Sequence, residues 1–303
     1  MTGPLLLTGA SGWFGRTALY EYEQEHGPEA LRRDVITFAS RERWVDFDSP
    51  HGPVKARPLE AITEVNNPAG LLHLAFLTRD KLEVLGWERY VTTNRAITAK
   101  LAEVLKAWPA MPVVATSSGA AAALDGQPPD LEGNPYATLK QEEEALLESE
   151  SATRMAMVFR VYAASGRFMT RPEKFALGDF LLQALRGEAI TLQSRRDVLR
   201  SYVHAGTLMR LAWRLLQARP PLNYYRVDAC QHTTTLRELA LTVSERFTLP
   251  PPRHEVDQAL PPDRYTADDR PFVNLLARMR IIPWNLAEQI EETAAGLRSR
   301  TRP

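Results

Sequence analysis

The segment LLLTGASGWFGRTALY, residues 5–20, constrains the fold more than any other part of the chain. An apolar run of strand length leads into Gly9, Gly12 and Gly15, spaced three residues apart, and a helical pattern follows. Glycine permits a tight turn there, and a helix N-terminus offers N–H groups and the positive end of a dipole to an anion. Strand, glycines and helix in this order predict a pyrophosphate-binding turn that opens a dinucleotide-binding fold.

Apolar runs alternate with helical segments through the first half of the chain. The runs begin at Pro4, Asp34, Gly70, Met111 and Arg154. Because strands buried on both faces read as continuous apolar runs, this alternation predicts a Rossmann-type, doubly wound parallel sheet covered by helices. We expect this dinucleotide-binding domain over residues 1–165, with a return segment at about 199–229. A smaller mixed α/β lobe, rich in proline, is expected to bind the substrate with residues 166–198 and 230–303.

Composition limits the classes of function. Lys plus Arg and Asp plus Glu are each 37, so no overall charge favours nucleic acid or an anionic membrane. Cys230 is the single cysteine, which excludes an intrachain disulfide and a cysteine-based zinc site. No apolar run approaches the roughly 18 residues of a membrane span, and the apolar start of the chain is too short for a secretion signal. We therefore expect a cytoplasmic protein that binds small molecules.

The residues after the second predicted strand bear on the choice of dinucleotide. A cofactor without a 2′-phosphate usually meets an Asp or Glu at the end of this strand. Here Ser40, Arg41 and Arg43 stand in its place. An arginine fork suits a 2′-phosphate, so we predict NADP(H), with NAD(H) as the alternative. The other interpretation, kept open by Glu42, is that the arginines only coat a solvated loop.

A tyrosine and a lysine share one face of a predicted helix that starts at residue 135. Asn134 is a candidate N-cap and Pro135 suits the first helical position. Tyr136 and Lys140 are four residues apart and therefore lie one above the other. An ammonium beside a phenol favours the phenolate and lowers the phenol pKa from about 10. This pattern predicts that Tyr136 donates and accepts a proton.

Together these motifs resemble the extended short-chain dehydrogenase/reductases, and within them the NAD(P)-dependent nucleotide-sugar epimerase/dehydratase family. The likeness rests on TGASGWFG, on the HLA of residues 73–75, on the TSS that ends at Ser118, and on the Tyr136/Lys140 pair. It continues through RGEAITLQSRRDVLRSYVH, TLRELALTV and IIPWNLAEQIEETAAGL, so it spans nearly the whole chain.

The resemblance implies roles for particular residues. Ser118 and Tyr136 match the catalytic hydroxyls, and Lys140 matches the lysine that binds the nicotinamide ribose. The implied cofactor contacts are Gly9, Ser11, Gly12, Trp13, Phe14, Gly15, Ser40, Arg41, Arg43, Leu59, Leu74, Ala75, Tyr136 and Lys140. Family members commonly form homodimers through the helix that carries the tyrosine and the helix before it.

Basic residues in two segments are candidate substrate contacts. Arg200 matches the residue that usually contacts the substrate diphosphate, and Arg195 and Arg196 precede it in a denser basic segment. Arg79 and Lys81 follow the strand near residue 70 and could meet a phosphate or carboxylate. For each of them the alternative is a surface ion pair or a solvated loop.

The departures from the family pattern narrow the chemistry. In ATSSGAAAALDG, residues 115–126, we expect a strand end that delivers Ser118 and then a loop whose alanines replace the usual Val-Tyr-Gly. Gly119 and Ala120 replace the acid and base of a dehydratase, Ala163 replaces an expected Asn, and Cys230 lies outside the segment used for 3,5-epimerisation. We therefore expect NADPH-dependent reduction of a 4-keto nucleotide sugar. The alternatives are an NAD-dependent 4-epimerase, a non-sugar ketone or aldehyde reductase, and a non-catalytic NADP sensor.

Overall fold

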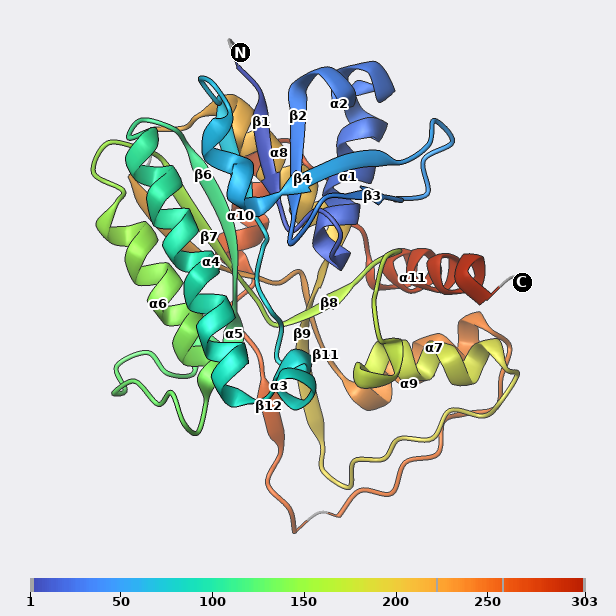
Figure 1. The fold of residues 1–303 in the computed structure, drawn as a ribbon. Helices are drawn as coiled ribbons and strands as arrows, with labels where there is room; N and C mark the ends of the chain where they lie inside the picture. Colours follow the sequence, from blue (N-terminus) through green and yellow to red (C-terminus); the bar gives the residue numbers. More distant parts are fainter. Residues whose placement is uncertain (1–2, 222, 258, 302–303) are drawn as a thin grey trace. The chain divides into compact units, whose positions relative to one another are not determined.

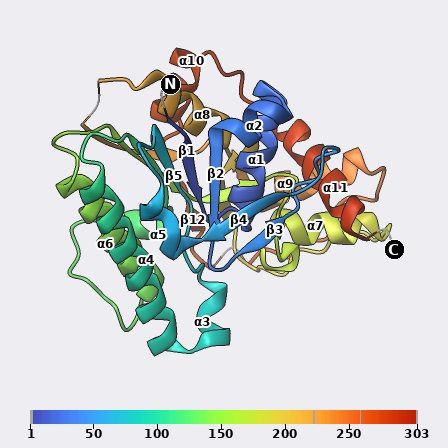
Figure 2. The ribbon, with the colours of Figure 1, turned by 45° about the horizontal axis from the view of Figure 1, so that its top comes forward.

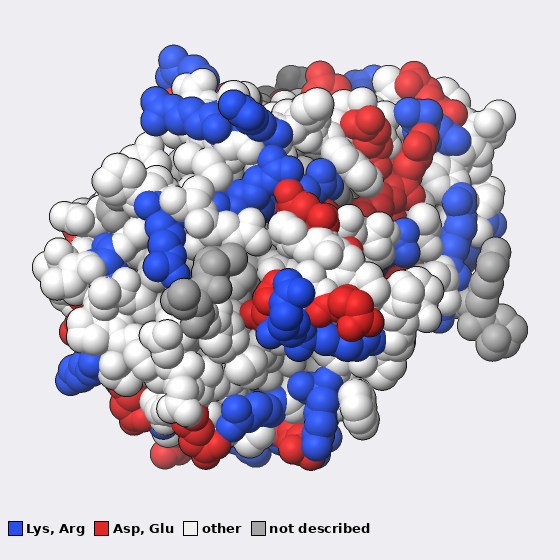
Figure 3. Space-filling model, turned by 90° about the horizontal axis from the view of Figure 1, so that it is seen from above, with Lys and Arg blue, Asp and Glu red and all other residues white. Residues whose placement is uncertain are grey.

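The computed structural model describes residues 3–221, 223–257 and 259–301 and divides into two compact units. The first comprises Met1–Arg160 and Met209–Val227, and the second comprises Val161–Leu208 and Asp228–Pro303. Within the described residues, no helix is both long enough and apolar enough to span a membrane. Lys and Arg side chains are interspersed with Asp and Glu on the face drawn in Figure 3, in keeping with the balanced composition.

The first unit is built on an eight-stranded sheet in the described part of the chain, with strand order β10-β7-β6-β5-β1-β2-β4-β3 (Figure 1). The strands are β1 (Leu5–Thr8), β2 (Val35–Ala39), β3 (Arg43–Val45), β4 (Val54–Pro58), β5 (Gly70–His73), β6 (Val113–Ser118), β7 (Ala156–Val161) and β10 (Tyr224–Ala229). β1 pairs in parallel with both β2 and β5, and β5 pairs in parallel with β6. Because strand order reverses at β1, the crevice beyond the carboxyl ends of β1 and β5 is where such sheets bind ligands. The predicted doubly wound α/β fold is confirmed.

Helices cover this sheet on both faces. α4 (Trp87–Ala107) and α6 (Pro135–Ser149) lie side by side in both views (Figures 1 and 2). α1 (Trp13–His26) packs against α8 (Ala205–Ala218), where the Trp213 indole N–H donates to the Ala18 carbonyl at 2.8 Å. Shorter elements complete the unit: α2 (Pro28–Asp34), η1 (Leu59–Glu64), α3 (Asp80–Leu85) and α5 (Gly119–Ala122). The central strands are buried, which explains their uninterrupted apolar sequence.

The second unit holds a four-stranded sheet around β9 (Val198–His204). β11 (His232–Thr235) pairs antiparallel with β9, while β8 (Ala163–Ser165) and β12 (Asp263–Tyr265) pair parallel with it. The remaining elements are η2 (Pro172–Lys174), α7 (Ala176–Leu185), α9 (Leu236–Arg246), α10 (Arg270–Arg278) and α11 (Leu286–Thr301). α9 begins with a capping box, in which the Thr235 side chain and Glu238 bond each other's backbone N–H.

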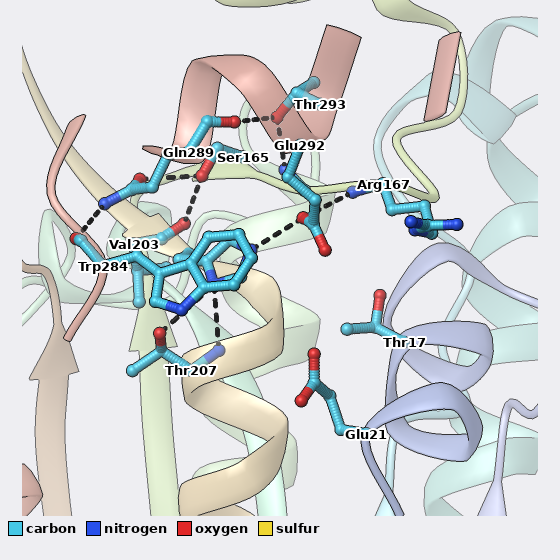
Figure 4. Close-up of polar contacts among 12 residues, drawn as sticks. Thr17, Glu21, Ser165, Arg167, Val203, Thr207, Trp284, Gln289, Glu292 and Thr293 are labelled. Atoms are coloured by element: carbon cyan, nitrogen blue, oxygen red, sulfur yellow. Dashed lines mark hydrogen bonds and ion pairs between the residues drawn. The ribbon is translucent and has the colours of Figure 1, made fainter. Parts of the chain in front are cut away.

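A buried polar cluster joins α11 to β8 and β9 in this unit (Figure 4). The Thr207 backbone N–H donates to His204 Nδ1 at 3.2 Å, so the ring proton lies on Nε2, which donates to the Glu292 carboxylate at 2.8 Å. Glu292 also accepts the Arg167 backbone N–H at 3.0 Å, and the Trp284 ring stacks on the His204 ring. These contacts fix the imidazole from both nitrogens, and we assign the cluster a structural role.

Glu292 gives the second unit a pH-dependent stabilisation. Burial opposes its ionisation, but the hydrogen bond from His204, the backbone N–H of Arg167 and the charge of Arg167 hold its pKa below the ordinary value. A lowered native pKa means that this stabilisation is present at neutral pH and is lost as the pH falls through the native pKa. We expect Glu292→Gln to lower the free energy of unfolding by about 1–3 kcal/mol at pH 7, and by less in acid.

The measurement is denaturant unfolding followed by circular dichroism at several pH values. Glu291→Gln is the matched control, because Glu291 is exposed on the same helix and pairs with Arg246. Equal effects of the two substitutions at pH 7 would contradict the role assigned to Glu292.

Candidate active site

The turn at the end of β1 contains three glycines. The fold leaves no room for a side chain at Gly9 or Gly15, but it does leave room at Gly12. Gly9 has φ +69°, and a Cβ there would lie 2.6 Å from the Leu74 carbonyl. A Cβ on Gly15 would lie 2.2 Å from the Gly9 carbonyl oxygen. A Cβ on Gly12 would meet only that oxygen, at 3.3 Å, and otherwise open space. The space in front of Gly12, at the N-terminus of the 14-residue helix α1, therefore fits a closely approaching ligand such as a pyrophosphate.

The neighbouring predicted cofactor residues take different environments. Ser11 is partly exposed, as are Trp13 and Phe14, whose rings stack with their centroids 5.5 Å apart. Leu74 and Ala75 follow β5, and their backbone N–H groups donate to the Thr8 hydroxyl at 3.1 and 3.2 Å. These two residues therefore lie beside Gly9, where the carboxyl ends of β1 and β5 meet.

The loop after β2 is basic and exposed. Ser40, Arg41 and Glu42 follow the strand, and Arg43 begins β3, all with exposed side chains. Glu42 forms an ion pair with Lys55 at 2.9 Å. Leu59, another predicted contact, begins η1 and packs against the core of the sheet.

Ser118 and Tyr136 are brought together from β6 and α6. Ser118 is the last residue of β6; its hydroxyl accepts the Ala120 N–H at 3.2 Å and is hydrogen-bonded to the Tyr136 side chain. α6 begins at Pro135 as predicted, although the Asn134 amide bonds Asp130 instead of capping the helix. The stretch expected to be a loop after Ser118 begins with the single helical turn α5.

The ammonium of Lys140 bonds groups other than the phenol that it was expected to tune. Its ammonium donates to the Thr116 carbonyl at 2.8 Å and to Glu143 Oε1 at 3.0 Å, and it lies 3.8 Å from the centre of the Phe76 ring. Burial raises the pKa of the Tyr136 phenol above its ordinary value, the hydrogen bond with Ser118 lowers it, and the charge of Glu143 raises it. The predicted lowering of this pKa was therefore wrong, because burial of the phenol and the charge of Glu143 outweigh the groups that lower it.

Two residues that contact Lys140, Phe76 and Glu143, were not predicted from the sequence. Phe76 stacks edge-on against Tyr136, with the ring centroids 5.9 Å apart, and also contacts Lys140. No sequence pattern identifies such a contact. Glu143 is different, since its position three residues after Lys140 places both on one helix face. That spacing was an available signal.

A second acid on α6 anchors the helix to the sheet. The guanidinium of Arg160, buried in β7, donates two hydrogen bonds to Glu144, at 2.9 and 2.7 Å, and also bonds Asp125 in the loop after α5. These bonds restrain α6 and the loop that follows Ser118 relative to the sheet.

The predicted substrate residues are spread over both units. In the first unit, Arg79 is exposed at the start of α3, where its charge lowers the Tyr136 pKa, and Lys81 pairs with Asp80 at 3.1 Å. In the second unit, Arg195 pairs with Asp257 at 3.5 Å and Arg200 pairs with Asp263 at 2.8 Å. Arg196, beside Arg195, is exposed.

Solved structures share this fold at low sequence identity. MoeE5 in complex with UDP-glucose and NAD is 19% identical with a TM-score of 0.74, over 99% of this chain and 100% of that one. The UDP-N-acetylglucosamine 4-epimerase from Methanobrevibacter ruminantium, in complex with UDP-N-acetylmuramic acid, is 17% identical with a TM-score of 0.75, over 99% of each chain. The UDP-glucose 4-epimerase from Thermotoga maritima is 18% identical with a TM-score of 0.70, over 99% of this chain and 100% of that one.

Comparison with curated protein sequences gave no match. A family model described as the NAD dependent epimerase/dehydratase family matches residues 5–226, well over half of the chain. The predicted family resemblance is thereby confirmed. The glycine turn, the parallel sheet and the Ser118–Tyr136 pair lie within the matched segment. The chain belongs to the NAD-dependent epimerase/dehydratase family.

Proposed function

We propose that the protein is an NADP(H)-dependent oxidoreductase that reduces the 4-keto group of a nucleotide-activated sugar. The observation that carries this proposal is the hydrogen bond between Tyr136 and Ser118 at the carboxyl end of β6. Two hydroxyls that share a proton at a strand end suit the reduction of a carbonyl, in which the oxygen must be bound and then protonated.

Each residue then has a defined task. A bound nicotinamide dinucleotide supplies the hydride. Ser118 hydrogen-bonds the carbonyl oxygen, and Tyr136 donates a proton to that oxygen. Lys140 is proposed to hold the nicotinamide ribose, and the turn around Gly12 is proposed to hold the pyrophosphate, since an added Cβ there would fill the space in front of the helix. Gly119 and Ala120 offer no acid or base for the elimination of water, which argues against dehydration.

The preference for a 2′-phosphate rests on the loop after β2. Arg41 and Arg43 are exposed there, while the acid between them, Glu42, is held by Lys55. The site therefore offers cationic donors to a phosphate at this position.

The substrate class is supported by the complexes of similar fold. MoeE5 is seen with UDP-glucose, and the M. ruminantium epimerase with UDP-N-acetylmuramic acid. By analogy we assign a nucleoside diphosphate sugar to this chain, with Arg79 and Arg200 as candidate contacts. Arg200 now pairs with Asp263, so a bound diphosphate would either replace Asp263 as the partner of Arg200 or share the guanidinium with it.

A second candidate is an NAD-dependent nucleotide-sugar 4-epimerase. It is favoured by the 4-epimerases among the structures of similar fold. An epimerase oxidises and then reduces the same carbon, so it consumes no net cofactor and retains its NAD. Purification with tightly held NAD, together with interconversion of UDP-sugars without added cofactor, would favour the epimerase over the reductase.

The assignment of the pyrophosphate to the turn around Gly12 predicts different effects for substitutions at two glycines. We expect Gly12→Ala to leave thermal unfolding of the free protein nearly unchanged and to weaken dinucleotide binding at least tenfold, because the new methyl group occupies the approach of the pyrophosphate. Gly15→Ala should instead lower thermal stability, because its Cβ meets the Gly9 carbonyl. Calorimetric titration with NADPH and scanning calorimetry measure both effects. Unchanged affinity in Gly12→Ala would remove the pyrophosphate from this turn.

The 2′-phosphate assignment is tested by removing the two arginines. The double variant Arg41→Ala/Arg43→Ala should lose about 10- to 100-fold in NADPH affinity, equivalent to about 1.4–2.8 kcal/mol, and little in NADH affinity. Arg33→Ala, which removes an exposed arginine on α2, is the control. Tighter binding of NADH than of NADPH by the unaltered protein would reject the assignment.

The chemical role of Tyr136 is tested with a panel of nucleoside diphosphate 4-keto sugars and NADPH. Tyr136→Phe should reduce turnover by about 10²–10⁴ while leaving dinucleotide affinity nearly intact, because the phenol acts as the proton donor. Tyr225→Phe, at an exposed tyrosine, should retain turnover. Wild-type turnover in Tyr136→Phe would refute the role. Activity on simple ketones without affinity for UDP, dTDP, CDP or GDP would identify a non-sugar reductase instead.

A further inference from the structure

The carboxylate of Glu143 is buried beside Lys140 on α6 of the first unit. Only 2% of the Glu143 side chain is exposed to solvent, and only 6% of the Lys140 side chain. Glu143 Oε1 accepts from the ammonium at 3.0 Å, while Oε2 lies 3.7 Å from His73 Nε2. Isolated buried charges are costly, so the two ions stabilise each other, and removing one would leave the other uncompensated.

The protonation of His73 follows from the hydrogen bonds around Thr8. The Thr8 hydroxyl oxygen accepts from the N–H groups of Leu74 and Ala75, which occupy its two lone pairs. Its own hydrogen is therefore donated to His73 Nδ1, 3.0 Å away. Nδ1 is an acceptor, so the ring is neutral and carries its proton on Nε2, facing Glu143. Lys140 is then the cation that balances the Glu143 carboxylate.

The ammonium of Lys140 is held on three sides. It donates to the Thr116 carbonyl at 2.8 Å and to Glu143, and the Phe76 ring lies against it at 3.8 Å. Thr116 belongs to β6, two residues before Ser118, so these contacts hold the lysine against the strand that carries the reacting hydroxyl.

Resting on the proposed function, we propose that Glu143 is a positioning residue for Lys140. It holds the ammonium against β6 and offsets its charge, so that Tyr136 remains a protonated phenol, ready to donate to a carbonyl oxygen. The step is a proton transfer: the Tyr136 O–H bond breaks and an O–H bond forms on the substrate oxygen. A bound reduced dinucleotide would supply the hydride for the new C–H bond. In the absence of Glu143, Lys140 would favour the phenolate.

The charges around the phenol are consistent with this role. The groups that face it are Ser118 on β6, Arg79 at the start of α3, Tyr90 on α4, Lys140 and Glu143 on α6, and, through Glu143, His73 on β5. Burial and the Glu143 charge raise the Tyr136 pKa, while the Ser118 hydrogen bond and Arg79 lower it. Burial raises the pKa of Tyr90 as well, so that phenol is neutral at working pH. Glu143 is thus the anion whose removal moves the Tyr136 pKa downward.

The test measures ionisation of Tyr136 without cofactor or substrate. The protein is labelled with ¹³C at tyrosine Cζ, and Tyr136→Phe identifies the resonance among nine tyrosines. In Glu143→Gln the ionisation midpoint should fall by about one pH unit or more relative to the unaltered protein. Glu143→Asp keeps the charge and should restore most of the midpoint. Glu142→Gln is the matched control, since Glu142 is exposed on the same helix and pairs with Arg95, and it should leave the midpoint unchanged.

Circular dichroism and thermal unfolding establish that each variant is folded. If Glu143→Gln does not fold, Glu143→Ala, which leaves room for water beside Lys140, carries the same expectation. A midpoint no lower than that of the unaltered protein overturns the inference, and so does the absence of ionisation in both proteins up to alkaline unfolding.

The experiments can reject the proposed function and the positioning role of Glu143 independently of each other. Absence of reductase activity leaves the ionisation result standing, because no substrate is present in that measurement. Conversely, a reductase whose Glu143→Gln variant keeps the wild-type midpoint loses only the positioning role. Where turnover is measurable, the alkaline limb of kcat/KM for reduction should move to lower pH in Glu143→Gln, because the donor is the protonated phenol.

Discussion

The Thr8 hydroxyl is the contact on which the arrangement of the first unit's site depends. It accepts two backbone N–H groups from the residues that follow β5 and donates to His73. One side chain at the end of β1 thereby fixes the end of its neighbour, in a sheet whose order reverses at β1. The Gly9 turn can approach Leu74 as closely as it does only because these strand ends are held in register. The glycine turn and the imidazole that faces Glu143 are therefore set by the same oxygen.

Helix α6 carries two consecutive acids that point in different directions, one toward the sheet and one toward Lys140. Glu144 bonds Arg160 of β7 and so anchors the helix to the sheet. Glu143 turns toward Lys140 and His73. Residues one position apart on a helix point about 100° apart, so adjacent carboxylates can serve the anchor and the site without competing. The charge run QEEE, which could read as a solvated face, contains two buried acids.

The sequence predicted the fold class well because its signals are local. Apolar runs of strand length, glycines at three-residue spacing and Pro135 at a helix start each act within a few residues, and the sheet, the turn and α6 follow them. The pairing of Ser118 with Tyr136 was implied by the family resemblance. What failed was the direction of the Tyr136 pKa shift. Burial of the phenol, the largest cause of the raised pKa, arises only from tertiary packing, whereas the opposing charge of Glu143 lies three residues from Lys140 and could have been foreseen. The functional roles themselves stay predictions.

The balance at Lys140 also bears on the direction of the chemistry. A tyrosine that stays protonated is a good donor for reducing a carbonyl and a poor base for oxidising an alcohol. A 4-epimerase needs both steps from one phenol in each turnover, so its phenol should titrate near working pH. In this chain, burial and Glu143 push the Tyr136 pKa upward, and only Ser118 and Arg79 oppose them. The buried carboxylate therefore supports the proposed role of Tyr136 as a proton donor by a route that is independent of the arginines after β2.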